Sequence, residues 1–129
     1  MKQVMADIAA VALGGGLGAT LRYGTCLLTM NVERFKAFPA GTALVNVIGC
    51  FAIGLLGGWI ESQQSFHHGW RLFLIVGVLG GFTTFSAFGF ETVGLLRDGR
   101  LLAGFVHVAL HLVLALFAVG VGFALTYRS

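Results

Sequence analysis

The hydrophobic residues of the chain fall in four long blocks that short polar stretches separate. The blocks cover approximately residues 4–29, 39–60, 70–96 and 101–127. Each block is about as long as the ~20 residues that a helix needs to cross the hydrocarbon core of a bilayer. Most of the charged residues lie in the intervals between the blocks. The pattern predicts an all-α membrane protein with a single domain, 1–129, of four transmembrane helices.

Composition supports this assignment and excludes a soluble protein. Of the 129 residues, 57% are hydrophobic and only 10% are charged, which leaves too few polar residues to cover a water-exposed surface. A secretory signal is an alternative for the first block, but Asp7, Arg22 and three further blocks favour an uncleaved helix. Cys26 and Cys50 lie within blocks, where small buried side chains are expected rather than a disulfide framework. The net charge of +3 indicates no nucleic-acid partner, so the expected surroundings are the lipid bilayer.

Four spans place both chain termini on one side of the membrane, together with the connection between the second and third helices. The basic residues on that side are Lys2, Arg71 and Arg128. Those on the opposite side are Arg34, Lys36, Arg97 and Arg100. A membrane protein is oriented by an excess of Lys and Arg on its cytoplasmic side. Because the two sides are nearly balanced here, neither orientation is clearly favoured. We predict dual topology, with oppositely oriented copies paired as an antiparallel homodimer; a single, weakly determined orientation remains the alternative.

Small residues recur at four-residue spacing in three of the blocks. The pairs are Gly14-xxx-Gly18, Gly54-xxx-Gly58 and Gly77-xxx-Gly81. This spacing allows two membrane helices to approach closely. We expect the pairs to support association of subunits.

Several polar residues lie inside the blocks, where an unpaired polar group is costly and is therefore a functional candidate. Arg22 is either an anion-attracting charge at a vestibule or an interfacial arginine that extends to the headgroups. Asn46 either bonds two helices together or holds an anion in a narrow pathway. His107 and His111 lie one turn apart on one face, as buried hydrogen-bonding groups or as a polar track; a metal or haem would need further ligands.

The third block contains a stretch, GVLGGFTTFSAFGFE, that is unusual for a plain membrane helix. Its glycines, followed by Thr83 and Thr84, predict an interruption of the helix. Such an interruption is tolerated at membrane depth only where protein buries it or where it lines a wet cavity. The carbonyl groups that it frees can bind a cation, and the freed N–H groups favour an anion.

Phe85 and Phe88 follow the interruption and share a helix face. The edge of an aromatic ring is electropositive, so ring edges can form a weak, dry lining for an anion. Packing of the two rings against neighbouring helices is the alternative.

Three segments of the chain, in this order, are GGGLGATLRY, PAGTALVNVIGCFAIG and GGFTTFSAFGFE. Together they resemble the CrcB/Fluc family of bacterial fluoride channels, and the resemblance extends over essentially the whole chain. It implies a four-helix subunit with the third helix broken near mid-membrane, in an antiparallel dual-topology homodimer with two pores. It implies passive export of fluoride across the cell inner (cytoplasmic) membrane, which relieves fluoride toxicity, and no enzymatic activity.

The resemblance also implies roles for individual residues. Asn46 would coordinate fluoride, and Phe85 and Phe88 would line the pore by their ring edges. The backbone carbonyls of Gly80 and Thr83 would hold a structural Na⁺ ion at the dimer interface.

A track of hydroxyl groups would continue the fluoride pathway, and it maps onto Thr84 and Ser86. In the fourth helix, His107 and His111 occupy positions where the family pattern leads us to expect hydroxyl side chains. Arg22 would lie at the anion vestibule, and Glu91 would be a pore-end or structural carboxylate.

Two other functions remain as alternatives. A small proton-coupled membrane exporter can also be an antiparallel four-helix dimer, but it needs a membrane-embedded acid in its first helix. Here Asp7 lies near the terminus and Glu91 lies in the third helix. A membrane assembly protein would carry no ion flux.

Overall fold

The computed structural model of the chain describes residues 1–30, 38–63 and 66–128. Within these residues, all regular structure is helical, and four helical segments are long and apolar enough to cross a membrane. They are Lys2–Met30, Ala40–Glu61, His68–Arg97 and Leu101–Thr126. Their ends lie within two residues of the predicted blocks, so the expectation of four membrane-spanning helices is confirmed.

The first two segments are the continuous helices α1 (Lys2–Met30) and α2 (Ala40–Glu61). The third consists of α3 (His68–Arg71), the π-helical η2 (Leu72–Leu79), α4 (Gly80–Phe82) and α5 (Phe85–Arg97). The fourth consists of α6 (Leu101–Ala109), the π-helical η3 (Leu110–Leu114) and α7 (Ala115–Thr126). A π-helical turn is wider than an α-helical one and is often found near functional sites.

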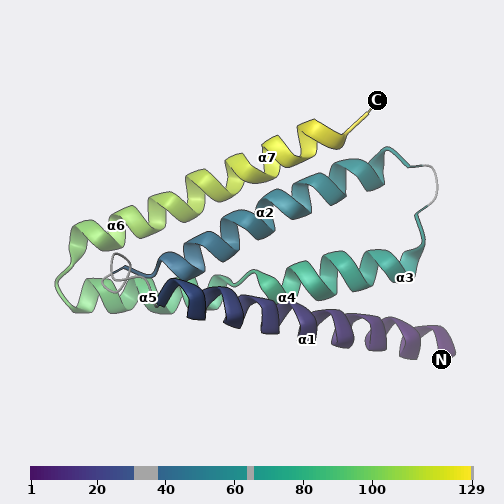
Figure 1. Ribbon diagram of the computed structural model, residues 1–129, viewed down its shortest axis with the longest axis horizontal. Coiled ribbons are helices and arrows are strands. Elements are labelled where there is room, and N and C mark those ends of the chain that lie inside the picture. The colour runs from purple at the N-terminus through teal and green to yellow at the C-terminus, as the bar shows by residue number, and fades with distance from the viewer. Residues whose placement is uncertain (31–37, 64–65, 129) are drawn as a thin grey trace.

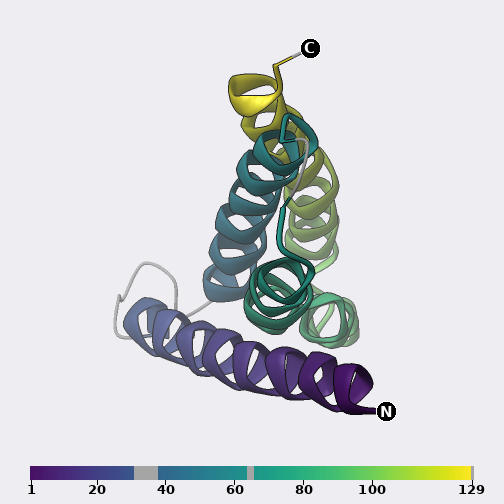
Figure 2. The ribbon, with the colours of Figure 1, turned by 90° about the vertical axis from the view of Figure 1, so that its right-hand side faces the viewer.

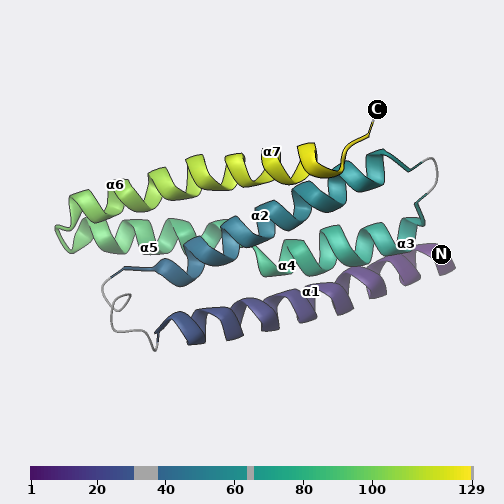
Figure 3. The same cartoon turned by 45° about the horizontal axis from the view of Figure 1, so that its top comes forward.

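Successive segments run antiparallel, so both termini lie at one end of the bundle and the α5–α6 turn lies at the other (Figure 1, Figure 3). This is the arrangement that four spans predict. Arg97 and Arg100 flank that turn. Arg34 and Lys36, on which the comparison of basic residues also depends, lie outside the described residues.

Two close helix pairs form the bundle: α1 packs against η2 and α4, and α2 packs against α7 (Figure 2). Glycines allow both contacts. Gly14 and Gly77 meet backbone to backbone, and a Cβ atom at Gly18 or Gly54 would overlap the backbone of the facing helix. The small-residue pairs therefore hold helices of one chain together. The expectation that they support a subunit interface was wrong, because a facing helix of the same chain already packs against these glycines.

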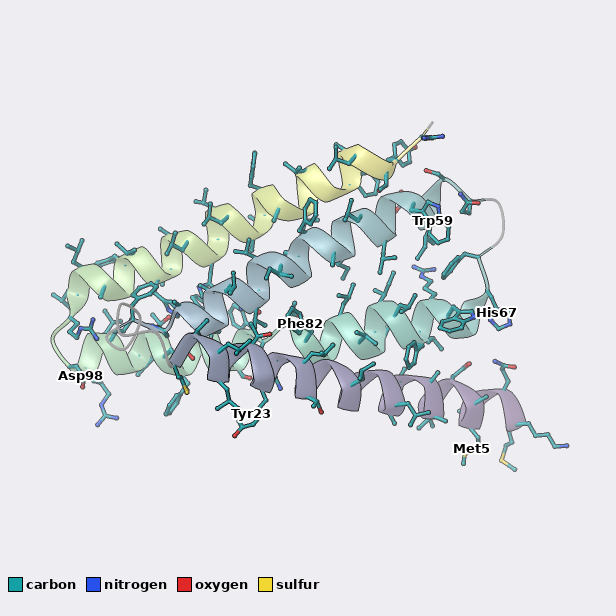
Figure 4. All side chains as sticks on the ribbon, viewed as in Figure 1. Met5, Tyr23, Trp59, His67, Phe82 and Asp98 are labelled. Carbon is teal, nitrogen blue, oxygen red and sulfur yellow. The ribbon has the colours of Figure 1, made fainter. Side chains whose placement is uncertain are left out.

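Large apolar side chains point outward over most of the bundle, and few are buried. Met5 and Tyr23, for example, project from α1 away from the other helices (Figure 4). The buried hydrophobic residues of the described chain are Val45, Leu79, Phe88, Leu95 and Ala118. Hydrocarbon accepts an apolar exterior of this kind, whereas water does not. The chain is a multi-pass membrane protein.

Candidate functional site

The third helical segment is interrupted between α4 and α5. Thr83 and Thr84 have extended backbone conformations, with φ/ψ of −78°/155° and −151°/117°. The α5 helix then begins at Phe85, and the hydroxyl of Thr84 caps it by accepting a hydrogen bond of 3.2 Å from the N–H of Ala87. Glycines before Thr83 and the capping threonine after it explain why the helix stops and restarts here.

Asn46 of α2 binds the backbone of this interruption. The Thr84 N–H donates to Asn46 Oδ1 at 2.7 Å, and Asn46 Nδ2 donates to the Thr84 carbonyl at 2.9 Å. The Thr84 N–H is thus directed to Asn46 instead of closing a helical turn onto the carbonyl of Gly80. Of the two roles considered for Asn46, the structure shows bonding between helices. An amide nitrogen carries two hydrogens, so one remains beyond this pair of bonds.

A second polar cluster joins α2, α5 and α6. The hydroxyl of Thr42 donates to Glu91 Oε1 at 2.6 Å. The other carboxylate oxygen, Glu91 Oε2, lies 3.6 Å from His107 Nε2. His107 is completely buried, with 0% of its surface exposed. The carboxylate therefore lies between a hydroxyl donor and an imidazole.

The two histidines continue this cluster toward Asn46. His107 Nδ1 lies 3.0 Å from the hydroxyl of Thr92, and His111 Nδ1 lies 2.9 Å from the carbonyl oxygen of His107. The ring of Phe88 packs against both imidazoles, with centroid separations of 5.4 Å to His107 and 4.4 Å to His111. We call the buried or half-buried set Thr42, Glu91, His107, His111, Asn46 and Thr84 the polar column.

A cavity lies at each end of the polar column. The larger, of about 440 Å³, is lined by Thr42 and Glu91 together with Cys26, Asp98 and Arg100. The smaller, of about 220 Å³, is lined by Asn46, Cys50, Thr83, Thr84, Phe85, Phe88, His111, Leu112 and Ala115. His107 contacts Glu91 of the first cavity and both Phe88 and His111 of the second. The imidazole of His107 therefore lies between lining residues of the two cavities.

The smaller cavity brings together most of the residues that the sequence singled out. Asn46, Thr84, Phe88 and His111 are buried around it. Phe85 also lines it, 5.3 Å from Phe88 between ring centroids, but 80% of its surface is exposed.

Other predicted residues lie at its margin or elsewhere. Ser86 is exposed, with its hydroxyl 3.2 Å from that of Thr84. Gly80 is exposed just before the interruption. Arg22 is half-buried on α1, and it lines neither cavity. The arginine that lines the larger cavity is Arg100.

Three contacting residues were not among the predicted site residues. Thr42 precedes Asn46 by one helical turn, and Thr92 follows Phe88 by one turn, so the helical period places both on the faces of predicted residues. Phe38 packs edge-on against His107, with centroids 5.5 Å apart and ring planes at 84°. It precedes α2, and no periodic signal indicated it.

Comparison with known proteins identifies the family. Residues 9–123 match the family described as CrcB-like protein, Camphor Resistance (CrcB). The chain belongs to the CrcB family. This confirms the resemblance drawn from its three sequence segments. It also places the interruption, the polar column and both cavities within the part of the chain that the family covers.

Relatives of this CrcB-family chain are named fluoride-specific ion channels. One from Flavobacterium psychrophilum is 42% identical over 118 residues, which cover 92% of this chain and 94% of that protein. One from Desulfotalea psychrophila is 43% identical over 121 residues, 94% of this chain and 92% of its own. One from Rhodococcus jostii, named FluC 2, is 46% identical over 116 residues, 90% of this chain and 95% of its own.

Within the described ranges, no group of three or more His, Cys, Asp and Glu side chains could hold a metal ion. Cys26 and Cys50 are both free thiols.

Proposed function

We propose that this protein is a fluoride-selective ion channel, and not an enzyme, that passively exports F⁻ across the cytoplasmic (cell inner) membrane. The observation that carries the proposal is the polar column, which links two cavities through the interior of a membrane protein. Membership of the CrcB family and relatives named fluoride-specific ion channels support fluoride as the ion.

Fluoride is small and strongly hydrated, so a pathway must replace its water with close hydrogen-bond donors. In the proposed pore, Asn46 offers the amide hydrogen that its bonds to Thr84 leave unused. The hydroxyls of Thr84 and Ser86 lie 3.2 Å apart, so one donates to the other and the second hydroxyl hydrogen offers a further donor beside Asn46. His107 and His111 continue the proposed pathway in the fourth helical segment.

Phe85 and Phe88 provide the apolar part of the proposed lining. Their rings are inclined at 54° to one another, which allows ring edges to face an ion between them. Edge contacts attract an anion weakly, and conduction needs binding that is strong enough for entry and weak enough for release. A narrow space of this kind also disfavours the larger chloride ion.

The functional unit in this proposal is an antiparallel, dual-topology homodimer with two pores. Phe85, Ser86 and Gly80 are exposed on the single chain. This supports the proposal, because residues that line a pore or bind an ion must be shielded from lipid, and a second subunit would shield them. The near balance of basic residues on the two sides supports insertion in both orientations. Arg22 and Arg100 are the basic side chains that would attract anions toward the pore entrances.

The proposal includes a structural Na⁺ ion at the interruption, and the backbone there supports it. The Thr84 N–H is bonded to Asn46, so the carbonyl of Gly80 lacks its usual helical partner. The carbonyl of Thr83 belongs to extended backbone at the same point. Carbonyl oxygens at the end of a half-helix suit Na⁺, and Gly80 and Thr83 would hold it between the two subunits, near mid-membrane.

Passive transport is sufficient for export. Fluoride that enters as HF ionises in a more neutral cytoplasm, and the channel lets the anion leave down its gradient. The test is fluoride efflux from liposomes that contain the purified protein, measured with a fluoride-selective electrode and repeated with chloride. Rapid fluoride efflux without a proton gradient, and little chloride efflux, is the expected result. Efflux only in the presence of a proton gradient would establish the proton-coupled exporter instead, and no ion flux at all would contradict both.

A further inference from the structure

Three buried polar atoms of the polar column lack a hydrogen-bond partner among the described residues. They are Glu91 Oε2, His107 Nε2 and His111 Nε2. Leaving such atoms unpaired is costly, so a cluster of them requires an explanation. Two of the three, Glu91 Oε2 and His107 Nε2, face each other at 3.6 Å.

The tautomer of His107 follows from its neighbour Thr92. The single hydroxyl hydrogen of Thr92 is donated to the carbonyl oxygen of Phe88 at 2.7 Å. Its contact of 3.0 Å with His107 Nδ1 therefore requires that Nδ1 carry the hydrogen and donate it. A neutral imidazole has one N–H, so neutral His107 presents a lone pair at Nε2.

The same reasoning applies to His111. Its Nδ1 lies 2.9 Å from the carbonyl oxygen of His107, which can only accept, so Nδ1 carries the hydrogen. Neutral His111 also has a lone pair at Nε2. An ionised Glu91 and two neutral histidines would therefore place acceptors, and one negative charge, in a proposed anion pathway.

One added proton resolves the contact between Glu91 and His107. On either Oε2 or Nε2, it converts two facing acceptors into a donor and an acceptor. We propose that Glu91 and His107 hold one proton between them, positioned by Thr92, and that this proton cancels the carboxylate charge and so permits anions to pass. The inference rests on the proposed fluoride pathway and adds a requirement to it.

Within the described ranges, the groups around Glu91 favour this proton as the compensation for its charge. Among the described residues, His107 is its only ion-pair contact. On α2, Thr42 and Asn46 do not ionise. In the part of the chain that the structure describes, the other titratable or charged groups that face the polar column are Cys26 of α1, Cys50 of α2, His111 of η3, and Asp98 and Arg100 at the mouth of the larger cavity. Loss of the shared proton at high pH leaves one negative charge in the pathway, so fluoride flux must fall as pH rises.

The test is fluoride efflux from proteoliposomes with equal pH inside and outside, from about pH 6 to about pH 9. The leak from protein-free liposomes is subtracted, because HF crosses lipid. The wild-type flux should be constant at the acidic end and then fall by up to about tenfold per pH unit, since a one-proton site changes its protonated fraction by that factor.

Three variants and one control identify the responsible groups. Glu91→Gln cannot ionise and can donate its amide hydrogen to His107 Nε2, so its flux should no longer vary with pH. Thr92→Val removes the acceptor for Nδ1–H and should shift the midpoint of the pH profile, whereas Thr92→Ser should restore the wild-type midpoint. Glu61→Gln is the matched control at the exposed end of α2, and it should keep the wild-type profile.

A spectroscopic measurement tests the tautomer without any flux. In ¹⁵N-histidine NMR of the protein in liposomes, the His107 signals, assigned by their loss in His107→Gln, should show a protonated Nδ1. The opposite tautomer, a wild-type fluoride flux that is constant over the whole pH range, or an unchanged pH profile in Glu91→Gln would each overturn the proposal while leaving the fluoride channel intact. Absence of fluoride flux at every pH would instead overturn the proposed function, and this inference with it.

Discussion

Replacing Asn46 by leucine tests the contact that binds α2 to the interrupted third segment. Leucine has a similar size and fills the same buried position, but it can neither accept from the Thr84 N–H nor donate to the Thr84 carbonyl. Asn46→Leu therefore removes the bonds of 2.7 and 2.9 Å together and leaves two backbone groups unpaired at a buried position.

The expected magnitude follows from these two bonds. A hydrogen bond between membrane helices contributes about 0.6 kcal/mol on average and up to about 1.7 kcal/mol, because the unfolded chain in the membrane also finds partners. Two such bonds give a loss of about 1–3 kcal/mol in the free energy of unfolding. A loss of this size raises the unfolding equilibrium constant by roughly 5- to 150-fold.

The free energy can be measured by reversible unfolding in mixed detergent micelles of increasing SDS content. Trp59 and Trp70 provide the fluorescence signal, since they lie at the end of α2 and the start of the third segment. Leu44→Ala on the same helix is the control, because Leu44 is 45% exposed and its loss should change the free energy by less than about 0.5 kcal/mol. If Asn46→Leu were as stable as wild type, the paired hydrogen bonds would not hold the interruption in place.

Further substitutions test the proposed pathway and the helix packing. Phe85→Ile and Phe88→Ile should each suppress fluoride efflux from liposomes without dissociating the proposed dimer in size-exclusion chromatography, and full flux in both would refute an aromatic lining. Asn46→Asp should block efflux because it places negative charge in an anion pathway; unaffected flux would remove Asn46 from the pore. Gly18→Ala should cost about 1–3 kcal/mol in the same unfolding assay, because a Cβ atom there overlaps the backbone of the facing helix. Gly16→Ala is its matched control, since a Cβ atom there meets nothing within 4 Å, and equal losses in the two variants would contradict the packing argument.

The sequence was sufficient to predict the helices, because the thickness of the bilayer determines how long an apolar segment must be. It also indicated where the third segment stops, since Thr83 and Thr84 follow a cluster of glycines. It could not reveal η2 and η3, because a π-helical turn leaves no mark on the composition of a uniformly apolar segment. The sequence also could not show which helices the glycine pairs contact. Small residues are needed for close approach of two helices whether these belong to one chain or to two.

The candidate site was predictable only in part, for a related reason. Asn46, Phe88, His107 and His111 stood out as individual residues, but their partners depend on contacts between distant parts of the chain. Thr42 and Glu91 are 49 positions apart, and nothing local to either predicts their hydrogen bond. Thr92 determines the tautomer of His107 because its one hydroxyl hydrogen is donated to the carbonyl of Phe88. That arrangement can be recognised only from the three-dimensional structure.

The contact between Asn46 and Thr84 has a consequence for how the protein is made. Helices leave the ribosome in chain order, so α2 enters the bilayer before residues 83 and 84 do. Asn46 is then already in the bilayer when the third helix inserts. It can bind the N–H and carbonyl groups of Thr84 at once, so these groups are not left unpaired in lipid. A rearranged gene in which α2 is synthesised last would lose this advantage, and its product would remain longer in the reach of membrane proteases.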